Sequence, residues 1–147
     1  MPSDQAVKER IRAAVQQREL GDTARARSMF ESLLPLAKSS STFDWLFFAH
    51  SFADVQEDLT EELRWDRAAL EALGQLTEAE AEAEQVHGGV AGLLPSLHLN
   101  LADVHRRLGD EVRAQHHHAE GSKHLDALDH GVYGRSIREA FAEFAKG

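Results

Sequence analysis

Residues 101–121 read LADVHRRLGDEVRAQHHHAEG, and their first part, residues 101–114, recurs twice earlier in the chain. Aligned with FADVQEDLTEELRW at 52–65, it matches Ala, Asp, Val, Leu, Glu and Arg in register. Aligned with AAVQQRELGDTARA at 13–26, it matches Ala14, Arg18, Leu20, Gly21, Asp22, Arg25 and Ala26. Such self-similarity indicates a repeat protein, in which each unit buries its apolar face against its neighbours.

Length and composition are those of a soluble globular protein. The chain has 147 residues, of which 42% are hydrophobic and 28% charged, which suits one domain with a real core. No apolar run approaches the roughly 18–20 residues that span a bilayer, and the N-terminal stretch has no apolar signal segment. We therefore expect a cytoplasmic protein. The absence of cysteine excludes disulfides, thiolate zinc sites and cysteine nucleophiles.

The net charge of -9 is unevenly distributed along the chain. Residues 1–38 hold 7 basic and 5 acidic side chains, residues 39–93 hold 2 and 12, and residues 94–147 hold 7 and 8. Nucleic acid and anionic membrane surfaces both need clustered Lys and Arg, so neither is expected as a partner. The acidic middle third leaves a basic partner open, beside the simpler interpretation of a solvated face that maintains solubility.

The first copy of the repeat predicts a helical hairpin. Apolar residues recur at steps of three and four between Val7 and Leu20, which is typical of one helix stripe. Gly21 stops this helix, and Asp22 is well placed to cap the N-terminus of a second helix that runs towards Lys38, because its carboxylate can accept free backbone amides.

The second copy departs from the first. A helix from Phe43 to Asp58 holds the densest aromatic run of the chain and should be buried on more than one side. Thr60 is the expected N-cap of the following helix, which reaches about Leu73, although only half of a capping box is present. Trp65 stands where the other copies have alanine, so the local helix packing must differ there.

An acidic insertion and the third copy follow. Thr77 begins a full capping box, so residues 79–86 are predicted as a short helix or as an extension of the preceding one. The glycines of residues 87–92 then break the helix. Helices are expected over 93–108 and 111–128, joined at Gly109 and Asp110. A helix over 135–145, with a stripe of Ile137, Phe141 and Phe144, should cover the end of the array.

With these residues in view, the sequence resembles the tetratricopeptide repeat family, and in particular small stand-alone bacterial members of it. The family pattern of small packing residues, a turn glycine and an aromatic corresponds to Ala14, Gly21, Ala26 and Phe30, and to Ala102, Gly109 and Ala114. The resemblance implies an all-α fold, a right-handed α-α superhelix of about three helix pairs in one domain, 1–147. The copies would be residues 5–38, 43–76 and 93–128, with an insertion at 77–92 and a capping helix at 135–146.

The resemblance also implies a scaffold that binds a protein or peptide on the concave face formed by the first helix of each pair. By repeat register, that face presents Arg12, Val15, Arg18, His50, Asp54, Glu57, Asp58, Asn100, Asp103, Arg106 and Arg107. Asp54 and Asp103 occupy the same position in two copies and would select basic or amide groups. Arg12, Arg106 and Arg107 could each hold a carboxylate bidentately, so a ligand of basic or mixed charge is expected.

Seven of the nine histidines lie between residues 98 and 130. His116, Glu120 and His124, spaced i, i+4 and i+8, share a helix stripe and form a weak candidate metal site, although a polar outer face is the simpler interpretation. His98, His105 and His118 occupy positions that are usually apolar. We expect them to form a half-buried, hydrogen-bonded cluster, and a pH-sensitive element or ligand site is the alternative.

No catalytic constellation stands out, because nucleophile-elbow, His-Glu-x-x-His, dinucleotide and phosphate-loop motifs are all missing. We therefore expect a binding module without catalysis and without a cofactor. A small-molecule or metal-binding helical protein and a self-associating structural protein are the alternatives. A homodimer is possible if the aromatic helix over 43–55 and the stripe of the last helix leave an apolar patch uncovered.

Overall fold

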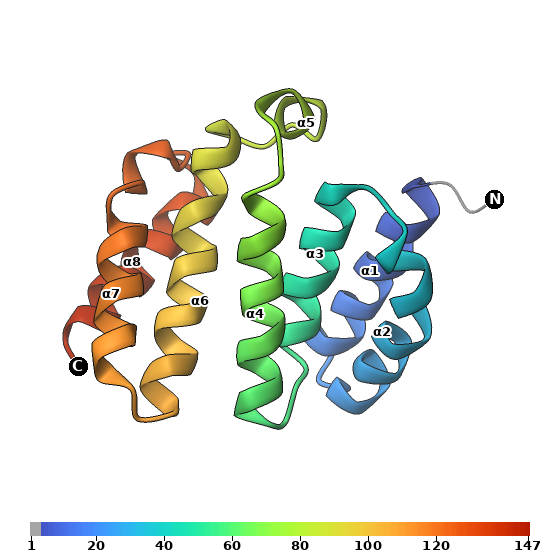
Figure 1. Ribbon diagram of the computed structural model, residues 1–147, viewed down its shortest axis with the longest axis horizontal. Helices are drawn as coiled ribbons and strands as arrows, with labels where there is room; N and C mark the ends of the chain where they lie inside the picture. The colour runs from blue at the N-terminus through green and yellow to red at the C-terminus, as the bar shows by residue number, and fades with distance from the viewer. Residues whose placement is uncertain (1–3) are drawn as a thin grey trace. The chain divides into compact units, whose positions relative to one another are not determined.

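The computed structural model describes residues 4–147, and these residues form an all-α structure (Figure 1). The described part of the chain contains eight α-helices and two short 3-10 helices and no strand, which confirms the predicted all-α class. The chain divides into two compact units: unit 1 ends at Gln75, and unit 2 is Leu76–Gly147. None of the helices within residues 4–147 is both long enough and apolar enough to cross a bilayer.

Unit 1 consists of two helix pairs. Helix α1 (Asp4–Glu19) packs against α2 (Thr23–Lys38), and α3 (Thr42–Ala53) packs against α4 (Leu59–Leu73). Helix α3 also contacts both α1 and α2, so it lies at the centre of the unit. The first two sequence copies therefore each form a helical hairpin.

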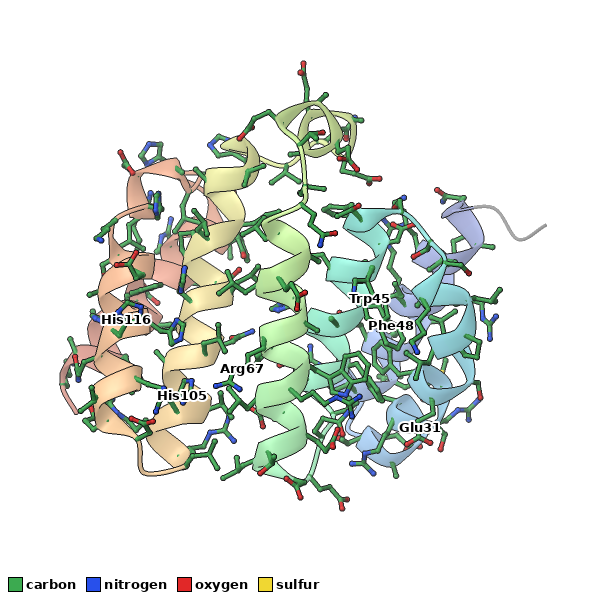
Figure 2. All side chains as sticks on the ribbon, viewed as in Figure 1. Glu31, Trp45, Phe48, Arg67, His105 and His116 are labelled. Atoms are coloured by element: carbon green, nitrogen blue, oxygen red, sulfur yellow. The ribbon has the colours of Figure 1, made fainter. Side chains whose placement is uncertain are left out.

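An aromatic cluster fills the core of unit 1 (Figure 2). The ring of Phe48 on α3 lies edge-on to Phe30 of α2 and to Trp65 of α4, with centroid distances of 5.7 Å and 5.9 Å. The ring centroids of Phe52 and Trp65 lie 4.9 Å apart, and Trp65 is only 8% exposed. Helix α3 is thus buried on more than one side, as its aromatic run predicts. Trp65 is therefore part of this core, at the position where the other copies have alanine.

The two glycine turns have nearly the same geometry. Gly21 and Gly109 have φ angles of +92° and +84°, in the left-handed region that favours glycine. Asp22 and Asp110 follow them and accept hydrogen bonds from the backbone N–H groups three residues later, at 3.1 Å and 3.0 Å. Both aspartates are therefore N-caps, and the expected match between the two turns is confirmed.

The connection between α3 and α4 differs from its prediction. Helix α3 ends at Ala53 and not at Asp58, and the N-cap of α4 is Asp58 and not Thr60. The Asp58 carboxylate accepts from the N–H groups of Thr60 and Glu61, at 2.7 Å and 3.3 Å. Asp58 has the extended backbone of a cap residue, and its carboxylate is a better acceptor for helix amides than a hydroxyl.

Unit 2 contains α5 (Glu78–Ala83), the 3-10 helix η1 (Gly89–Leu93), α6 (Leu94–Arg107), α7 (Glu111–Ser122), the 3-10 helix η2 (Leu125–Ala127) and α8 (Val132–Ala145). Helices α6 and α7 form the third hairpin, and α8 packs against both of them. The capping box at Thr77 is confirmed, and α5 is a separate short helix. Pro95 lies in the first turn of α6, as expected.

The end of unit 2 corrects two predicted boundaries. Helix α7 stops at Ser122 and not at residue 128, and α8 begins at Val132 and not at Arg135. The guanidinium of Arg138 donates to the carbonyl oxygens of Leu125, Leu128 and Asp129, at 3.1, 3.2 and 2.8 Å. Arg138 thereby holds the chain in a non-helical path, and the Asp129 carboxylate accepts from the N–H groups of Gly131 and Gly134, at 2.9 Å and 3.0 Å.

Helix α8 approaches the hairpin closely at one glycine. A Cβ atom on Gly121 of α7 would lie 2.7 Å from Phe141 of α8 and 3.0 Å from the Cβ of His98 on α6. Phe141 is buried and Phe144 is half-buried, so the stripe predicted for the last helix does pack inward. Glycine at position 121 therefore allows helices α6, α7 and α8 to approach one another closely.

Candidate functional site

A hollow of unit 2 lies between α6 and α8 and has a volume of about 560 Å³. We refer to this hollow as the α6–α8 groove. Its lining residues are Leu99, Asn100, Asp103 and Arg106 from α6, and Ala140, Glu143 and Phe144 from α8. The spacing of three and four residues along each helix places these side chains on one face. Asn100, Asp103 and Arg106 are three of the residues that repeat register assigns to the concave face.

Arg106 is held by its own unit. Its Nε and Nη2 atoms donate to the Glu111 carboxylate at 3.2 Å and 2.7 Å, and Nη1 donates to the carbonyl oxygen of Phe144 at 2.8 Å. The guanidinium also lies over the Phe144 ring. The hydrogen bond to Glu111 is the main cause that raises the pKa of Arg106. Arg106 therefore forms part of the groove wall, and its Nε and Nη2 donors are already bound to Glu111.

The acidic residues of the groove are paired at the surface. Asp103 accepts from Arg107 at 2.7 Å, and Glu143 accepts from Lys146 at 2.8 Å. Their side chains are 55% and 72% exposed. Ion pairs this exposed are worth little, about 0.2–1 kcal/mol, so either carboxylate can exchange its partner for a ligand cation. Asp103 and Glu143 are thus the two carboxylates of the groove that are available to a cationic group of a ligand.

Unit 1 brings three predicted concave-face residues together. Nη1 of Arg18 on α1 lies 3.5 Å from Oδ2 of Asp54, which directly follows α3. Burial lowers the pKa of His50 on α3 below its ordinary value, while Asp54 opposes this effect and Arg18 adds to it. Burial raises the pKa of the Asp54 carboxyl, with His50 and Arg18 acting against the shift. His50, Asp54 and Arg18 therefore interact electrostatically where α1 lies against the C-terminal end of α3.

The structure places the other predicted unit 1 residues elsewhere. Asp58 is engaged as the N-cap of α4, and Glu57 lies 3.3 Å from Arg27 of α2. Arg27 also donates from Nε to the carbonyl oxygen of Val55, at 2.8 Å. Arg12 is exposed on α1, and Val15 is half-buried.

Two of the three histidines predicted to cluster, His98 and His105, lie against His117, which was not among the predicted members. The Nδ1 atoms of His98 and His117 lie 3.0 Å apart, which requires one to donate and the other to accept. The ring of His105, only 3% exposed, stacks on His117 at a centroid distance of 5.5 Å. His118 hydrogen bonds through Nε2 to the carbonyl oxygen of Phe141, at 3.0 Å. His118 belongs to a separate contact with α8.

The weak metal candidate finds no support in this arrangement. Among residues 4–147, no group of three or more His, Asp or Glu side chains is placed to hold a metal ion. His124 lies beyond the end of α7, so the i, i+4, i+8 register of His116, Glu120 and His124 does not continue through it. Glu120 accepts from Lys123 at 2.7 Å, which lowers the pKa of its carboxyl. His116 is exposed, so an outer polar face describes it better.

Sequence reasoning missed the half of the groove that comes from α8. Ala140 and Glu143 were not singled out, and Phe144 was assigned only to the covering stripe. The signal that was available is the spacing of Ala140, Glu143 and Phe144 along the last helix, which places them on one face next to Phe141. Side chains that the sequence stripe assigns to the core can also form a wall of the hollow.

Comparison of the chain with protein-family models, with curated proteins and with solved structures found no match.

Proposed function

We propose that this chain is a peptide-binding module of the tetratricopeptide repeat type, and that the α6–α8 groove receives the ligand. The observation that carries the proposal is the convergence of Asn100, Asp103 and Arg106 on one hollow of unit 2. These residues were selected from repeat register alone, as positions that should face a ligand. The hollow adds apolar walls to them, which is the composition that peptide grooves use.

The walls of the groove suit one apolar side chain of a peptide. Leu99, Ala140 and Phe144 supply the apolar surface. The guanidinium group of Arg106 packs on the face of the Phe144 ring, with its central carbon 3.6 Å from the ring centroid, and restricts the ring. A pre-formed aromatic surface lowers the ordering cost of binding, because the side chain does not have to be immobilised again. An apolar residue of the peptide would therefore act as the anchor.

The rim of the groove favours a basic residue beside that anchor. Asp103 and Glu143 are exposed, and their present partners are weakly held surface cations. A lysine or arginine of the ligand can replace Arg107 or Lys146 without leaving an unpaired charge buried. Arg106 is bound to Glu111 and to the Phe144 backbone, so it contributes shape and not ligand charge. The proposed ligand is a peptide segment with an apolar anchor and a neighbouring basic residue.

Two tryptophan substitutions, each replacing an alanine of α8, test the groove. Ala140→Trp fills the hollow, whereas Ala142→Trp places the same ring on an exposed position of the same helix that does not line it. Random linear peptides displayed on phage are selected on the parent protein, and the enriched peptides are synthesised and titrated by fluorescence anisotropy. The expected result is enrichment of apolar-basic peptides that bind the parent and Ala142→Trp equally and bind Ala140→Trp at least about tenfold more weakly.

Two outcomes would contradict the proposal. One is a selection that enriches no peptide above background. The other is equal binding of the enriched peptides to both tryptophan variants, which would move the contact surface away from the groove. Asp103→Asn should also weaken binding and reduce its dependence on salt, because it removes one exposed charge that attracts the ligand.

A further inference from the structure

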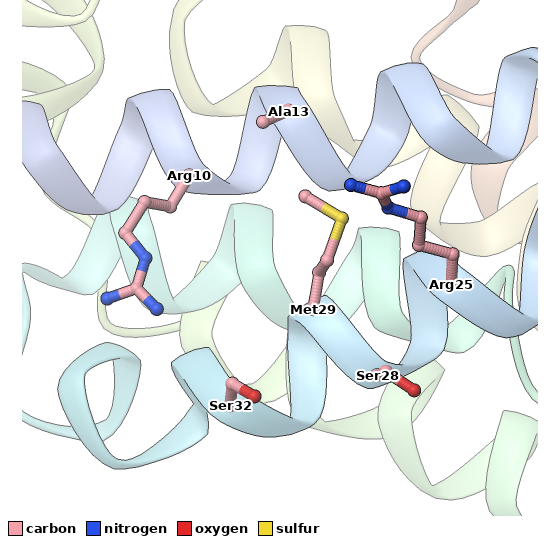
Figure 3. A pocket seen from close by; sticks show the side chains of 6 residues that line it. All are labelled: Arg10, Ala13, Arg25, Ser28, Met29 and Ser32. Atoms are coloured by element: carbon pink, nitrogen blue, oxygen red, sulfur yellow. The ribbon is translucent and has the colours of Figure 1, made fainter.

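Unit 1 carries a second hollow, on the face of the α1–α2 hairpin (Figure 3). Its volume is about 270 Å³. The lining residues are Arg10 and Ala13 from α1, and Arg25, Ser28, Met29 and Ser32 from α2. None of them belongs to the concave-face set that repeat register predicts. We refer to this hollow as the Arg10–Arg25 hollow.

The side chains of the hollow have an ordered arrangement. Met29 extends from α2 towards α1 and Ala13, and it forms an apolar centre (Figure 3). Arg10 and Arg25 lie on opposite sides of Met29, and each reaches from its own helix towards the other one. Ser28 and Ser32 lie one helical turn apart on α2 and are exposed. The hollow therefore presents an apolar centre with a cation on either side and hydroxyl groups along one edge.

Neither arginine has an anionic partner among the residues that the structure describes. Within residues 4–147, the guanidinium groups of Arg10 and Arg25 form no ion pair, whereas Arg18 and Arg27 of the same two helices lie against Asp54 and Glu57. No acidic side chain lines the hollow. An arginine fork binds a carboxylate strongly through paired hydrogen bonds. Two such forks are thus available to a ligand.

The charge distribution of the chain favours an acidic partner at this place. Residues 1–38 hold 7 basic and 5 acidic side chains, so this hairpin is the one stretch with a basic excess in a chain of net charge -9. Met29 lies between the two arginines and offers apolar surface, which a single small anion would leave unused. A peptide can use this surface together with both arginines, because its side chains are separated by backbone.

We propose that the Arg10–Arg25 hollow binds an acidic peptide segment in which an apolar side chain lies between two carboxylate side chains. The apolar residue packs on Met29 and Ala13, where the flexible thioether of methionine adapts to its shape. One carboxylate binds Arg10 and the other binds Arg25, and the two serine hydroxyls donate to the same acidic groups or to the peptide backbone. This site and the α6–α8 groove have different linings and opposite ligand charge, so the chain would link two partners.

Synthetic peptides test this assignment on the full-length chain. A fluorescein-labelled peptide of alternating glutamate and leucine is titrated by anisotropy at constant ionic strength, beside one with glutamine for glutamate and one with glycine for leucine. Only the glutamate-leucine peptide should bind well. The double variant Arg10→Gln, Arg25→Gln should weaken its binding at least about tenfold, since it removes two charge-assisted contacts. The double variant Ser28→Ala, Ser32→Ala should weaken binding by a smaller factor.

A charge-matched control separates the hollow from general electrostatics. Lys38→Gln, Arg135→Gln removes two positive charges from exposed positions that do not line the hollow. This variant should bind the peptide within about twofold of the parent. Circular dichroism checks that all three double variants fold, which is expected because the six replaced side chains are exposed.

Three results would overturn the proposal. The first is equal weakening in the control and hollow variants, and the second is no binding of the glutamate-leucine peptide at millimolar concentration. The third is that inorganic phosphate at matched ionic strength displaces the peptide while the glycine peptide binds as well as the leucine peptide. That result would assign the hollow to a free anion.

Discussion

The guanidinium carbon of Arg106 lies 3.6 Å from the centroid of the Phe144 ring, and Nη1 of the same residue donates to the Phe144 carbonyl oxygen at 2.8 Å. The two residues are 38 positions apart in sequence, so this contact fastens the last turn of α8 to the end of α6. Glu111 binds the opposite edge of the guanidinium at 2.7 Å. One side chain therefore connects three helices of unit 2.

Arg106→Lys should lower the melting temperature more than Arg113→Lys does. Lysine keeps the charge of Arg106, but it cannot bind Glu111 bidentately, reach the Phe144 carbonyl and stack on the ring at once. Among residues 4–147, Arg113 pairs only with Asp110, which lies in its own turn, and its side chain is 65% exposed. Thermal unfolding followed by circular dichroism measures both changes. Equal melting temperatures would show that the Arg106 contacts stabilise unit 2 no more than the exposed Arg113–Asp110 pair does.

Trp65→Ala should destabilise the protein by about 3–5 kcal/mol, because it empties the centre of an aromatic core. The ring contacts Phe48 and Phe52 and is only 8% exposed. Tyr133→Ala is the control, since that aromatic side chain is 52% exposed and should be nearly neutral. Urea denaturation gives both free energies of unfolding. A small effect of Trp65→Ala would mean that the indole is not part of the core.

The N-cap of α4 can be tested with two alanine substitutions. Asp58→Ala should lower the free energy of unfolding by about 0.5–2 kcal/mol, since two helix amides lose their acceptor. Thr60→Ala should change it by less than about 0.5 kcal/mol, as for an exposed residue without such a role. Urea denaturation compares the two variants. The reverse order would restore Thr60 as the cap.

Gly109→Ala should cost about 1–2 kcal/mol, because an alanine must enter the left-handed region at a φ of +84°. A Cβ atom at this position would meet nothing within 4 Å, so the cost is conformational and not steric. Gly109→Asn should cost less, since asparagine tolerates this region better. If the alanine and asparagine variants are equally unstable in urea, the backbone angle is not the cause.

Stability should decrease as the pH falls below about 6.5, the ordinary value for histidine. Burial lowers the pKa of His98 in the folded state, with Glu120 opposing the shift, so the unfolded chain binds a proton first and is favoured on acidification. His50 acts in the same direction. His98→Gln should therefore reduce the loss of unfolding free energy between about pH 7.5 and about pH 5 without abolishing it. An unchanged pH dependence would exclude His98 as a contributor.

The parts of the fold that could be predicted from sequence are those that local physics determines. Gly21 with Asp22, and Gly109 with Asp110, each define a turn within a few residues, since a left-handed glycine and a capping carboxylate act on their immediate neighbours. The capping box at Thr77 is equally local. The N-cap of α4 was predicted wrongly because Asp58 and Thr60 are two residues apart and both have side chains that can cap a helix N-terminus.

The parts that could not be predicted depend on residues far apart in sequence. The path from Ser122 to Val132 is set by Arg138, whose side chain reaches back to the carbonyl oxygen of Leu125, 13 positions earlier. The second wall of the α6–α8 groove comes from α8, and repeat register says nothing about that helix. The partners of Arg106 likewise follow only from the packing of α8. Helix stripes predict which face is buried but not which side chains meet across it.

The main helix pairs of the structure, α1 with α2, α3 with α4 and α6 with α7, are each formed by helices that follow one another in the sequence. Each hairpin closes over a connection of a few residues, so forming it costs little loop-closure entropy. Proteins dominated by such short-range contacts fold in microseconds to milliseconds. During synthesis, α1 and α2 can therefore associate before α6 has left the ribosome, whereas α6 and α7 can be covered by α8 only after α8 itself has emerged.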